Sequence, residues 1–185
     1  MAGAIIETER LRLTPFAQDE MEDLHLLWTR PEVRRYLWDG EIIPEAQTAE
    51  ILRQNRALFA EHGFGLWGVR RKDSPILLGF GGFWHFRDPP ELELILGFRS
   101  SAWGKGLATE TGSALVRYAF EALGFDEVRG STDAPNERSA RLMQRLGMEF
   151  ERREVVGGLD TVFYSIRRSA WSPADAAYPV EPHGG

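Results

Sequence analysis

One stretch of the sequence, residues 94–121, constrains the fold more than any other. It reads LILGFRSSAWGKGLATETGSALVRYAFE: an apolar strand, a turn of small residues at 103–106 (the glycine turn) and a long amphipathic helix. A helix start presents unpaired backbone N–H groups and about half a positive charge, and Lys105 adds a cation. This stretch therefore predicts a binding site for an anion such as the phosphate of a cofactor.

Apolar periodicity along the rest of the chain predicts both strands and helices. The middle of the chain is expected to form an antiparallel meander, and residues 91–132 a β-α-β unit with a right-handed crossover. This order predicts the α+β class, with a mixed, mostly antiparallel sheet flanked by helices. The expected strands are residues 4–14, 65–71, 77–86, 91–98, 127–132, 148–156 and 161–167, and the expected helices are residues 19–28, 33–38, 45–62, 104–123 and 136–146.

The chain has 185 residues, enough for one hydrophobic core and short for two domains. We expect a single domain over residues 1–171 and a loosely ordered, proline-rich tail over residues 172–185. No apolar run approaches the roughly 20 residues that span a bilayer, and the first residues lack the pattern of a secretory signal. These features favour a cytoplasmic protein with no membrane partner.

Charge and residue usage restrict the partners and the chemistry. A formal net charge of -6 is unfavourable for binding a nucleic acid and fits a cationic or amine-bearing partner. The sequence has no cysteine, which excludes disulfides, thiolate metal sites and a cysteine nucleophile. Its four histidines lack the spacing of metal ligands, so no metal site is expected.

A dinucleotide-binding fold is the main alternative interpretation of the glycine turn. Asp126 follows Gly106 at the spacing of roughly 20 residues that separates the glycine motif from the ribose-binding acid in such folds. However, Thr109 occupies the third glycine position, and Asp126 lies before the second strand of the unit rather than at its end. The strands before the turn also form a meander, which disfavours this alternative.

Three motifs together carry a resemblance to a known family. They are WGKGLATE at the glycine turn, PNERSARLMQRLGMEF about thirty residues later, and TERLRL near the N-terminus. In these segments the chain resembles the GNAT superfamily of acetyl-CoA-dependent N-acetyltransferases. It is most similar to the branch that includes ribosomal-protein N-terminal (Rim-type) acetyltransferases, and the match extends to about Trp171.

The resemblance implies a central mixed sheet that splays near its middle, with acetyl-CoA in the gap. Backbone groups of Leu96 and Phe98 would pair with the pantetheine arm, as implied by the family. The family's usual Arg or Gln three residues before the first glycine is Ser101 here, which weakens one side-chain contact and leaves the backbone amides intact. The pyrophosphate would bind the amides around Gly104, Lys105, Gly106, Leu107 and Ala108.

Direct acetyl transfer needs a group that takes a proton from the attacking amine. In this branch a glutamate on the strand before the glycine turn commonly has that position, and the matching residue is Glu93. Strand alternation places Glu91 and Glu93 on one face and the leucines of residues 92–96 on the other. The alternative is that both glutamates belong to a solvated outer face of the sheet.

The group that protonates the departing thiolate is less defined by the sequence. Many family members have a tyrosine seven residues after the asparagine of the second helix, and that position is Met143 here. In the N-terminal acetyltransferase branch the serine of N-x-x-S is the proposed substitute, which corresponds to Ser139, with Asn136 as a cofactor-binding partner. The alternative is that Asn136 only caps its helix; both roles are compatible.

The acceptor is expected to be an amine. An α-amine is easier to deprotonate than a lysine side chain by about 3.3 kcal/mol, so a single carboxylate suits a protein N-terminus or a small amine. In this family the acceptor enters between the first helices and the late hairpin. The residues expected to bind it are Trp38, Trp84 and His85, with Asp39 and Glu41 nearby.

Two readings of the function remain open from the sequence. The favoured one is an acetyl-CoA-dependent N-acetyltransferase, and family members are often homodimers. The other is a non-catalytic module that has the same fold and holds acyl-CoA without turnover. It stays open because the family's catalytic tyrosine is absent from its usual position, where this sequence has Met143. CoA release with a panel of amines would separate them.

Overall fold

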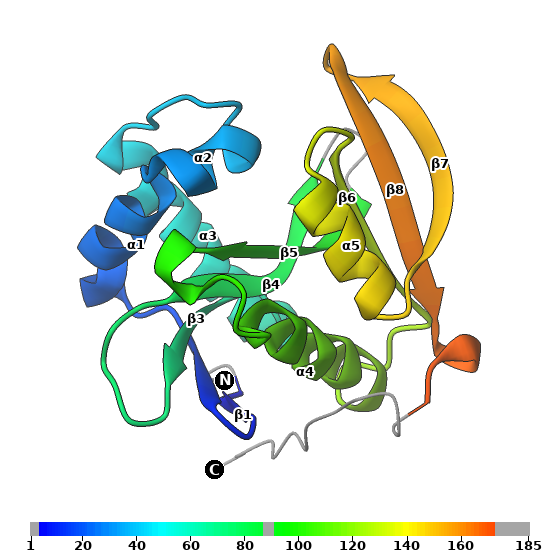
Figure 1. Cartoon of the computed structure of the whole chain (residues 1–185). Helices are drawn as coiled ribbons and strands as arrows, with labels where there is room; N and C mark the ends of the chain where they lie inside the picture. Colours follow the sequence, from blue (N-terminus) through cyan, green and yellow to red (C-terminus); the bar gives the residue numbers. More distant parts are fainter. Residues whose placement is uncertain (1–3, 87–90, 173–185) are drawn as a thin grey trace.

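The computed structural model describes residues 4–86 and 91–172. It contains two antiparallel sheets, one five-stranded in the order β1-β2-β3-β4-β5 and one three-stranded in the order β6-β8-β7 (Figure 1). The strands are β1 (Ile6–Glu7), β2 (Leu11–Pro15), β3 (Leu66–Arg71), β4 (Gly79–Phe86), β5 (Glu91–Phe98), β6 (Glu127–Asp133), β7 (Glu149–Val156) and β8 (Leu159–Arg167). The helices are α1 (Met21–Trp28), α2 (Pro31–Leu37), α3 (Glu45–His62), α4 (Leu107–Glu121) and α5 (Glu137–Arg145).

The two sheets meet where β5 passes β6. A Cβ atom on Gly130 would lie 3.5 Å from the carbonyl oxygen of Leu94, an ordinary van der Waals distance, so the two strands are in contact here. The neighbouring residues are also joined, because Ser131 donates a hydrogen bond to Glu93. No ladder joins β5 to β6 in the described residues, and the expected splayed sheet is confirmed.

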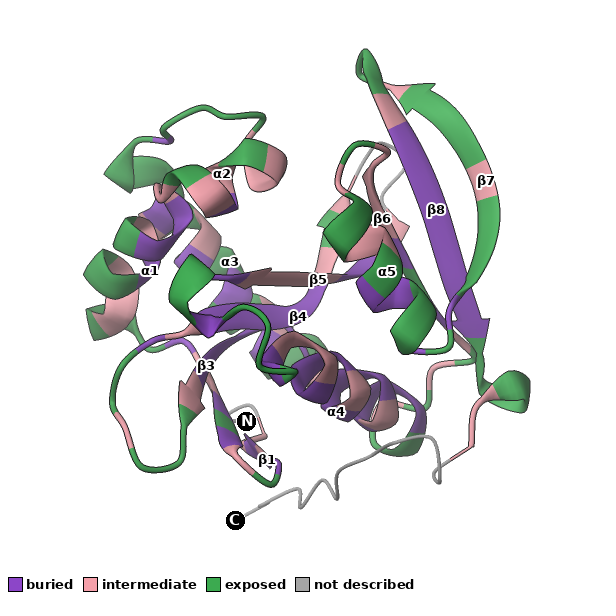
Figure 2. Cartoon of the chain, in the orientation of Figure 1, coloured by how far each residue is buried: buried purple, intermediate pink, exposed green. Residues whose placement is uncertain are grey.

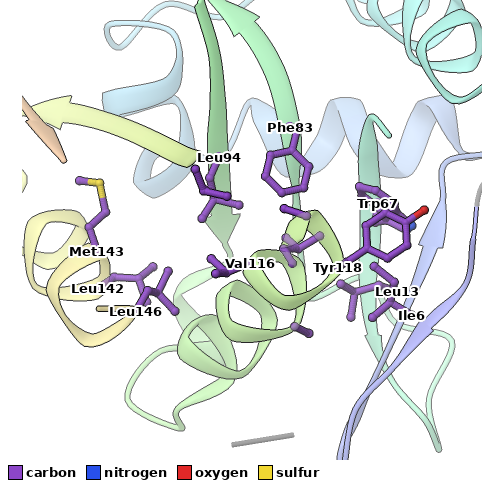
Figure 3. Packing of buried hydrophobic residues seen from close by; sticks show 14 of the residues in the cluster. Ile6, Leu13, Trp67, Phe83, Leu94, Val116, Tyr118, Leu142, Met143 and Leu146 are labelled. Carbon is purple, nitrogen blue, oxygen red and sulfur yellow. The ribbon is translucent and has the colours of Figure 1, made fainter. Parts of the chain in front are cut away.

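Helices cover both faces of the five-stranded sheet. Alternate residues of β5 divide between two clusters: Leu92, Leu94 and Leu96 pack in the cluster with α4, whereas Ile95 packs in the cluster with α1, α2 and α3. In Figure 3 the α4 cluster extends from Trp67 on β3 to Leu142 on α5. Burial of this apolar surface from both sides fixes which face each β5 side chain occupies.

The two strands of the hairpin in the smaller sheet, β7 and β8, differ in burial. Figure 2 shows β8 mostly buried and β7 mostly exposed. The hairpin expected at residues 148–167 is therefore present, with its middle strand in the core and β7 at the edge.

Several expected elements differ from the structure at their ends, and two of these differences have a clear cause in the backbone. The single strand expected over residues 4–14 is two strands, because residues 8–10 turn toward α4. The helix expected from residue 104 begins at Leu107, because Gly104 and Gly106 have φ angles of 70° and 75°, outside the helical region. The tail expected at residues 172–185 lies, apart from Ser172, outside the described residues.

Across residues 4–86 and 91–172, no helix combines the length and the apolar character needed to cross a lipid bilayer.

Candidate active site

The glycine turn leads directly into α4. Gly106 occupies the N-cap position with a left-handed backbone, and no side chain in the described part of the chain caps this helix. The N–H groups of its first turn are therefore available to an external acceptor. Lys105 Nζ donates to the Ser101 carbonyl at 2.8 Å, which keeps its ammonium group beside the turn. This set of amide donors and one cation fits a diphosphate.

The edge of β5 beyond the meeting point with β6 is suited to an extended ligand. Arg99 N–H donates to the Leu78 carbonyl, on the β4 side of the strand. Because backbone groups alternate in direction along a strand, those of Leu96 and Phe98 point away from β4, toward the gap between the sheets. Trp103 Nε1 donates to the Phe98 carbonyl at 3.0 Å, consistent with this direction. Leu96 and Phe98 thus direct backbone groups away from β4, and their contact with pantetheine stays a prediction.

Glu93 is a buried acid at the point where the two sheets meet. Its exposed fraction is 4%, and its Oε2 accepts a hydrogen bond of 2.6 Å from Ser131 Oγ. It lies opposite Trp84 in the β4–β5 ladder. The alternative of a solvated outer face is therefore wrong for Glu93, and its carboxylate is held where β5 and β6 meet.

Helix α5 contributes Asn136 and Ser139 from its start. Asn136 holds the N-cap position, but its side chain makes no capping bond and donates instead to Thr132 Oγ1 at 3.0 Å. Its carbonyl accepts from the Ser139 N–H, which places Ser139 in the first turn. Among the described residues, the Asn136 side chain therefore does not cap α5, contrary to the structural alternative. Asn136 and Ser139 lie beside the end of β6.

Met143, at the position of the family's tyrosine, faces the core. Its exposed fraction is 6%, and its sulfur lies 3.1 Å from where a Cβ of Gly130 would be. Figure 3 shows Met143 on α5 among the buried hydrophobic residues. A thioether has no proton to donate. This position therefore cannot protonate a thiolate in this chain.

The three predicted acceptor residues do not share one face. Trp38 and Trp84 both pack against the cluster of α1, α2 and α3, on the Glu93 side of the sheet. Trp38 contacts Trp28 edge-on at 5.4 Å, and its Nε1 has no hydrogen-bond partner in the described residues. His85 points to the opposite face, 6.2 Å from Phe64. The geometry brings the tryptophans together and leaves His85 apart.

Asp39 and Asp133 form an acidic pair, of which the sequence predicted only Asp39 near the acceptor. Burial, and then the nearby Asp39 carboxylate, raise the pKa of Asp133 at the end of β6. Asp39 follows α2 and has a positive φ of 53°, which turns the chain after the helix. Asp39 was expected near the acceptor, whereas Asp133 and Ser131 had no local signal because their partners lie far away in the sequence.

Comparisons with known proteins agree with this architecture. Residues 10–149 match the family model described as Acetyltransferase (GNAT) domain. The uncharacterized N-acetyltransferase YoaA of Bacillus subtilis is 29% identical over 80% of this chain and 84% of its own length. A putative GNAT-family acetyltransferase structure from Bordetella pertussis covers 87% of this chain and 98% of that chain, with a TM-score of 0.77 and 21% identity.

A structure of RimL, a ribosomal-protein α-N-acetyltransferase in complex with coenzyme A, also has this fold. It covers 90% of this chain and 99% of that chain, with a TM-score of 0.74 and 16% identity. At that identity the likeness concerns the fold alone. Together with the family model, which spans well over half of the chain, these matches show that the protein belongs to the GNAT family of N-acetyltransferases.

Proposed function

We propose that this enzyme moves an acetyl group from acetyl-CoA directly to a primary amine, on a protein N-terminus or a small molecule. The observation that carries the proposal is the buried carboxylate of Glu93, held by Ser131 at the edge of the gap between the sheets. Such a group lies where an amine from one side would meet a thioester from the other.

The acetyl-CoA site is assigned to the glycine turn and the free edge of β5. The amides around Gly104, Lys105, Gly106, Leu107 and Ala108 would bind the pyrophosphate, and the outward backbone groups of Leu96 and Phe98 the pantetheine arm. Acetyl-CoA supplies the activated acetyl thioester. Asn136, whose side chain makes no capping bond to its helix among the described residues, is assigned to the same cofactor side.

The reaction needs two proton transfers, one from the attacking amine and one to the departing thiolate. Glu93 accepts the proton that the amine nitrogen loses as it bonds to the acetyl carbon, directly or through water. The carbon–sulfur bond breaks, and the thiolate sulfur takes a proton either from water or from the Ser139 hydroxyl, whose oxygen then regains a proton from water. Because Met143 is excluded chemically, Ser139 at the start of α5 is the side chain we assign to this step.

The acceptor side favours a cationic amine. Trp38 and Trp84 supply aromatic surface on the Glu93 side, and Asp39 and Asp133 place negative charge nearby. An ammonium group is attracted to both aromatic faces and carboxylates. The structure of RimL, an α-N-acetyltransferase of a ribosomal protein, supports a protein N-terminus as one candidate.

The proposal is tested by CoA release from acetyl-CoA with a panel of acceptors: N-terminal peptides, small primary amines and amines blocked by prior acetylation. We expect release with free amines only, and the acetylated product by mass spectrometry. Tight CoA binding without release for any amine would instead support the non-catalytic module.

A further inference from the structure

A fully buried carboxylate lies directly behind the glycine turn and has no role in the chemistry above. Glu110, in the first turn of α4, has an exposed fraction of 0%. A negative charge is favourable at a helix start, but here it lies close to the amides assigned to an anionic diphosphate. A buried carboxylate of this kind needs a cation and hydrogen bonds to be tolerated.

Both oxygens of Glu110 are bound by the N-terminal turn between β1 and β2. Oε1 accepts bonds from Thr8 Oγ1 and from the Arg10 backbone N–H, the latter at 2.9 Å. Oε2 lies 2.7 Å from Arg10 Nε and 2.7 Å from Arg10 Nη2. Arg10 thus presents one edge of its planar guanidinium to a single carboxylate, an arrangement that a lysine cannot reproduce.

The other edge of the same guanidinium reaches the glycine turn. Arg10 Nη1 donates to the Lys105 carbonyl at 3.0 Å, and Nη2 lies 3.4 Å from where a Cβ of Gly106 would be. In a trans peptide the carbonyl and the following N–H point in opposite directions. With the Lys105 carbonyl held against Arg10, the N–H of Gly106 points away from it.

We propose that Arg10 is a positioning residue for the diphosphate of CoA. It is anchored by Glu110, orients the peptide between Lys105 and Gly106, and places a positive charge behind the amides where Ser101 offers none. The inference rests on the proposed function, because it concerns the same cofactor. It explains why a chain segment about a hundred residues away in sequence turns toward α4.

The test compares two ligands that differ in the phosphates. CoA carries the diphosphate and pantetheine does not, so the affinity of each for the purified full chain is measured by calorimetry, and the KM of acetyl-CoA and of acetyl-pantetheine by thiol release. For Arg10→Ala we expect CoA affinity to fall about tenfold to a hundredfold, as for a lost charge-assisted hydrogen bond, with pantetheine affinity and kcat unchanged. Arg12→Ala is the matched control, because Arg12, two residues further on in β2, pairs only with Glu7 at the surface among the described residues.

Further variants separate positioning from general stability. Arg10→Lys keeps the positive charge but loses the planar guanidinium that bonds both Glu110 and the Lys105 carbonyl. This variant should fold, and it should still bind CoA more weakly than the parent. In Arg10→Ala/Glu110→Gln the buried charge is gone, and we expect the melting temperature to recover while the CoA affinity does not.

Three results would overturn the inference: equal losses for CoA and pantetheine, unchanged CoA affinity in both Arg10 variants, or recovery of CoA affinity in the double variant. If the parent protein itself failed to bind CoA, the proposed function would fail instead.

Discussion

The cofactor side and the acceptor side of this enzyme are built in different ways. The binding groups proposed for the cofactor side are mostly backbone amides from consecutive residues, 104–108, with Arg10 and Glu110 behind them. On the acceptor side the groups are side chains from separate elements: Glu93 on β5, Ser131 on β6 and Trp84 on β4. Substitutions should therefore act on cofactor binding through backbone conformation and on the reaction through lost functional groups.

The largest expected effect is on the acceptor side. Replacing Glu93 with Gln removes the proposed proton acceptor and should lower kcat/KM about 10²- to 10⁴-fold, while CoA affinity stays unchanged. Thiol release measures kcat/KM, and calorimetry measures the affinity for CoA. Glu91→Gln is the control on the same strand face, where Glu91 lies 3.9 Å from Arg152. A similar loss of activity in both variants would remove Glu93 from its assigned role.

The second prediction concerns the hydrogen bond that holds Glu93. Ser131→Ala removes a donor to a buried carboxylate and should reduce kcat about tenfold, since such bonds contribute about 1.5–3 kcal/mol. Steady-state kinetics of the Ser131→Ala variant measures the change in kcat. Ser165→Ala removes a comparable bond to Glu151, 2.7 Å long and on β8, and should leave kcat unchanged. If the two serine variants behaved alike, the position of Glu93 would not depend on Ser131.

On the cofactor side, Gly106→Ala forces a side chain into the left-handed region at φ 75°. We expect about 1 kcal/mol of lost stability and weaker CoA binding by about tenfold, because the strained turn moves the amides. Gly124→Ala, at φ 74° after α4, costs similar backbone strain away from the turn. Denaturant unfolding and calorimetry should thus show equal destabilisation with CoA affinity reduced in Gly106→Ala alone; equal affinities would contradict the assigned site.

The smallest expected effect is the pH dependence of Asp133. Its pKa is raised above the ordinary value of 3.8, so its contribution to stability is fully present below that pH and is lost as pH rises through the folded-state pKa. Asp133→Asn should therefore melt higher than the parent near pH 7, with the difference vanishing below about pH 4. The KM for cationic amines should rise about twofold to fivefold.

Asp160→Asn is the control with the opposite sign. The Arg153 guanidinium lowers the pKa of Asp160, so this variant should gain no stability at neutral pH and leave the KM unchanged. A gain in both variants would point to net charge rather than to the local contacts of Asp133.

The glycine turn at the start of α4 could be predicted from the sequence because its signals are local. Two glycines before an amphipathic helix require no knowledge of distant residues, and strand alternation correctly separated Glu93 from Leu96. The same alternation places Trp84 and His85 on opposite faces, and the grouping of these two was the weakest part of the predicted acceptor site.

The order of strands and helices, the glycine turn and the family resemblance can be predicted from the sequence, since they depend on periodicity and on motifs of neighbouring residues. Only the tertiary structure decided that Ser131 holds Glu93, that Asp39 lies near Asp133, and that Arg10 binds Glu110. Each of these contacts joins residues far apart in the chain. Such pairs have no local pattern, because packing of the two sheets and α4, and not propensity, brings them together.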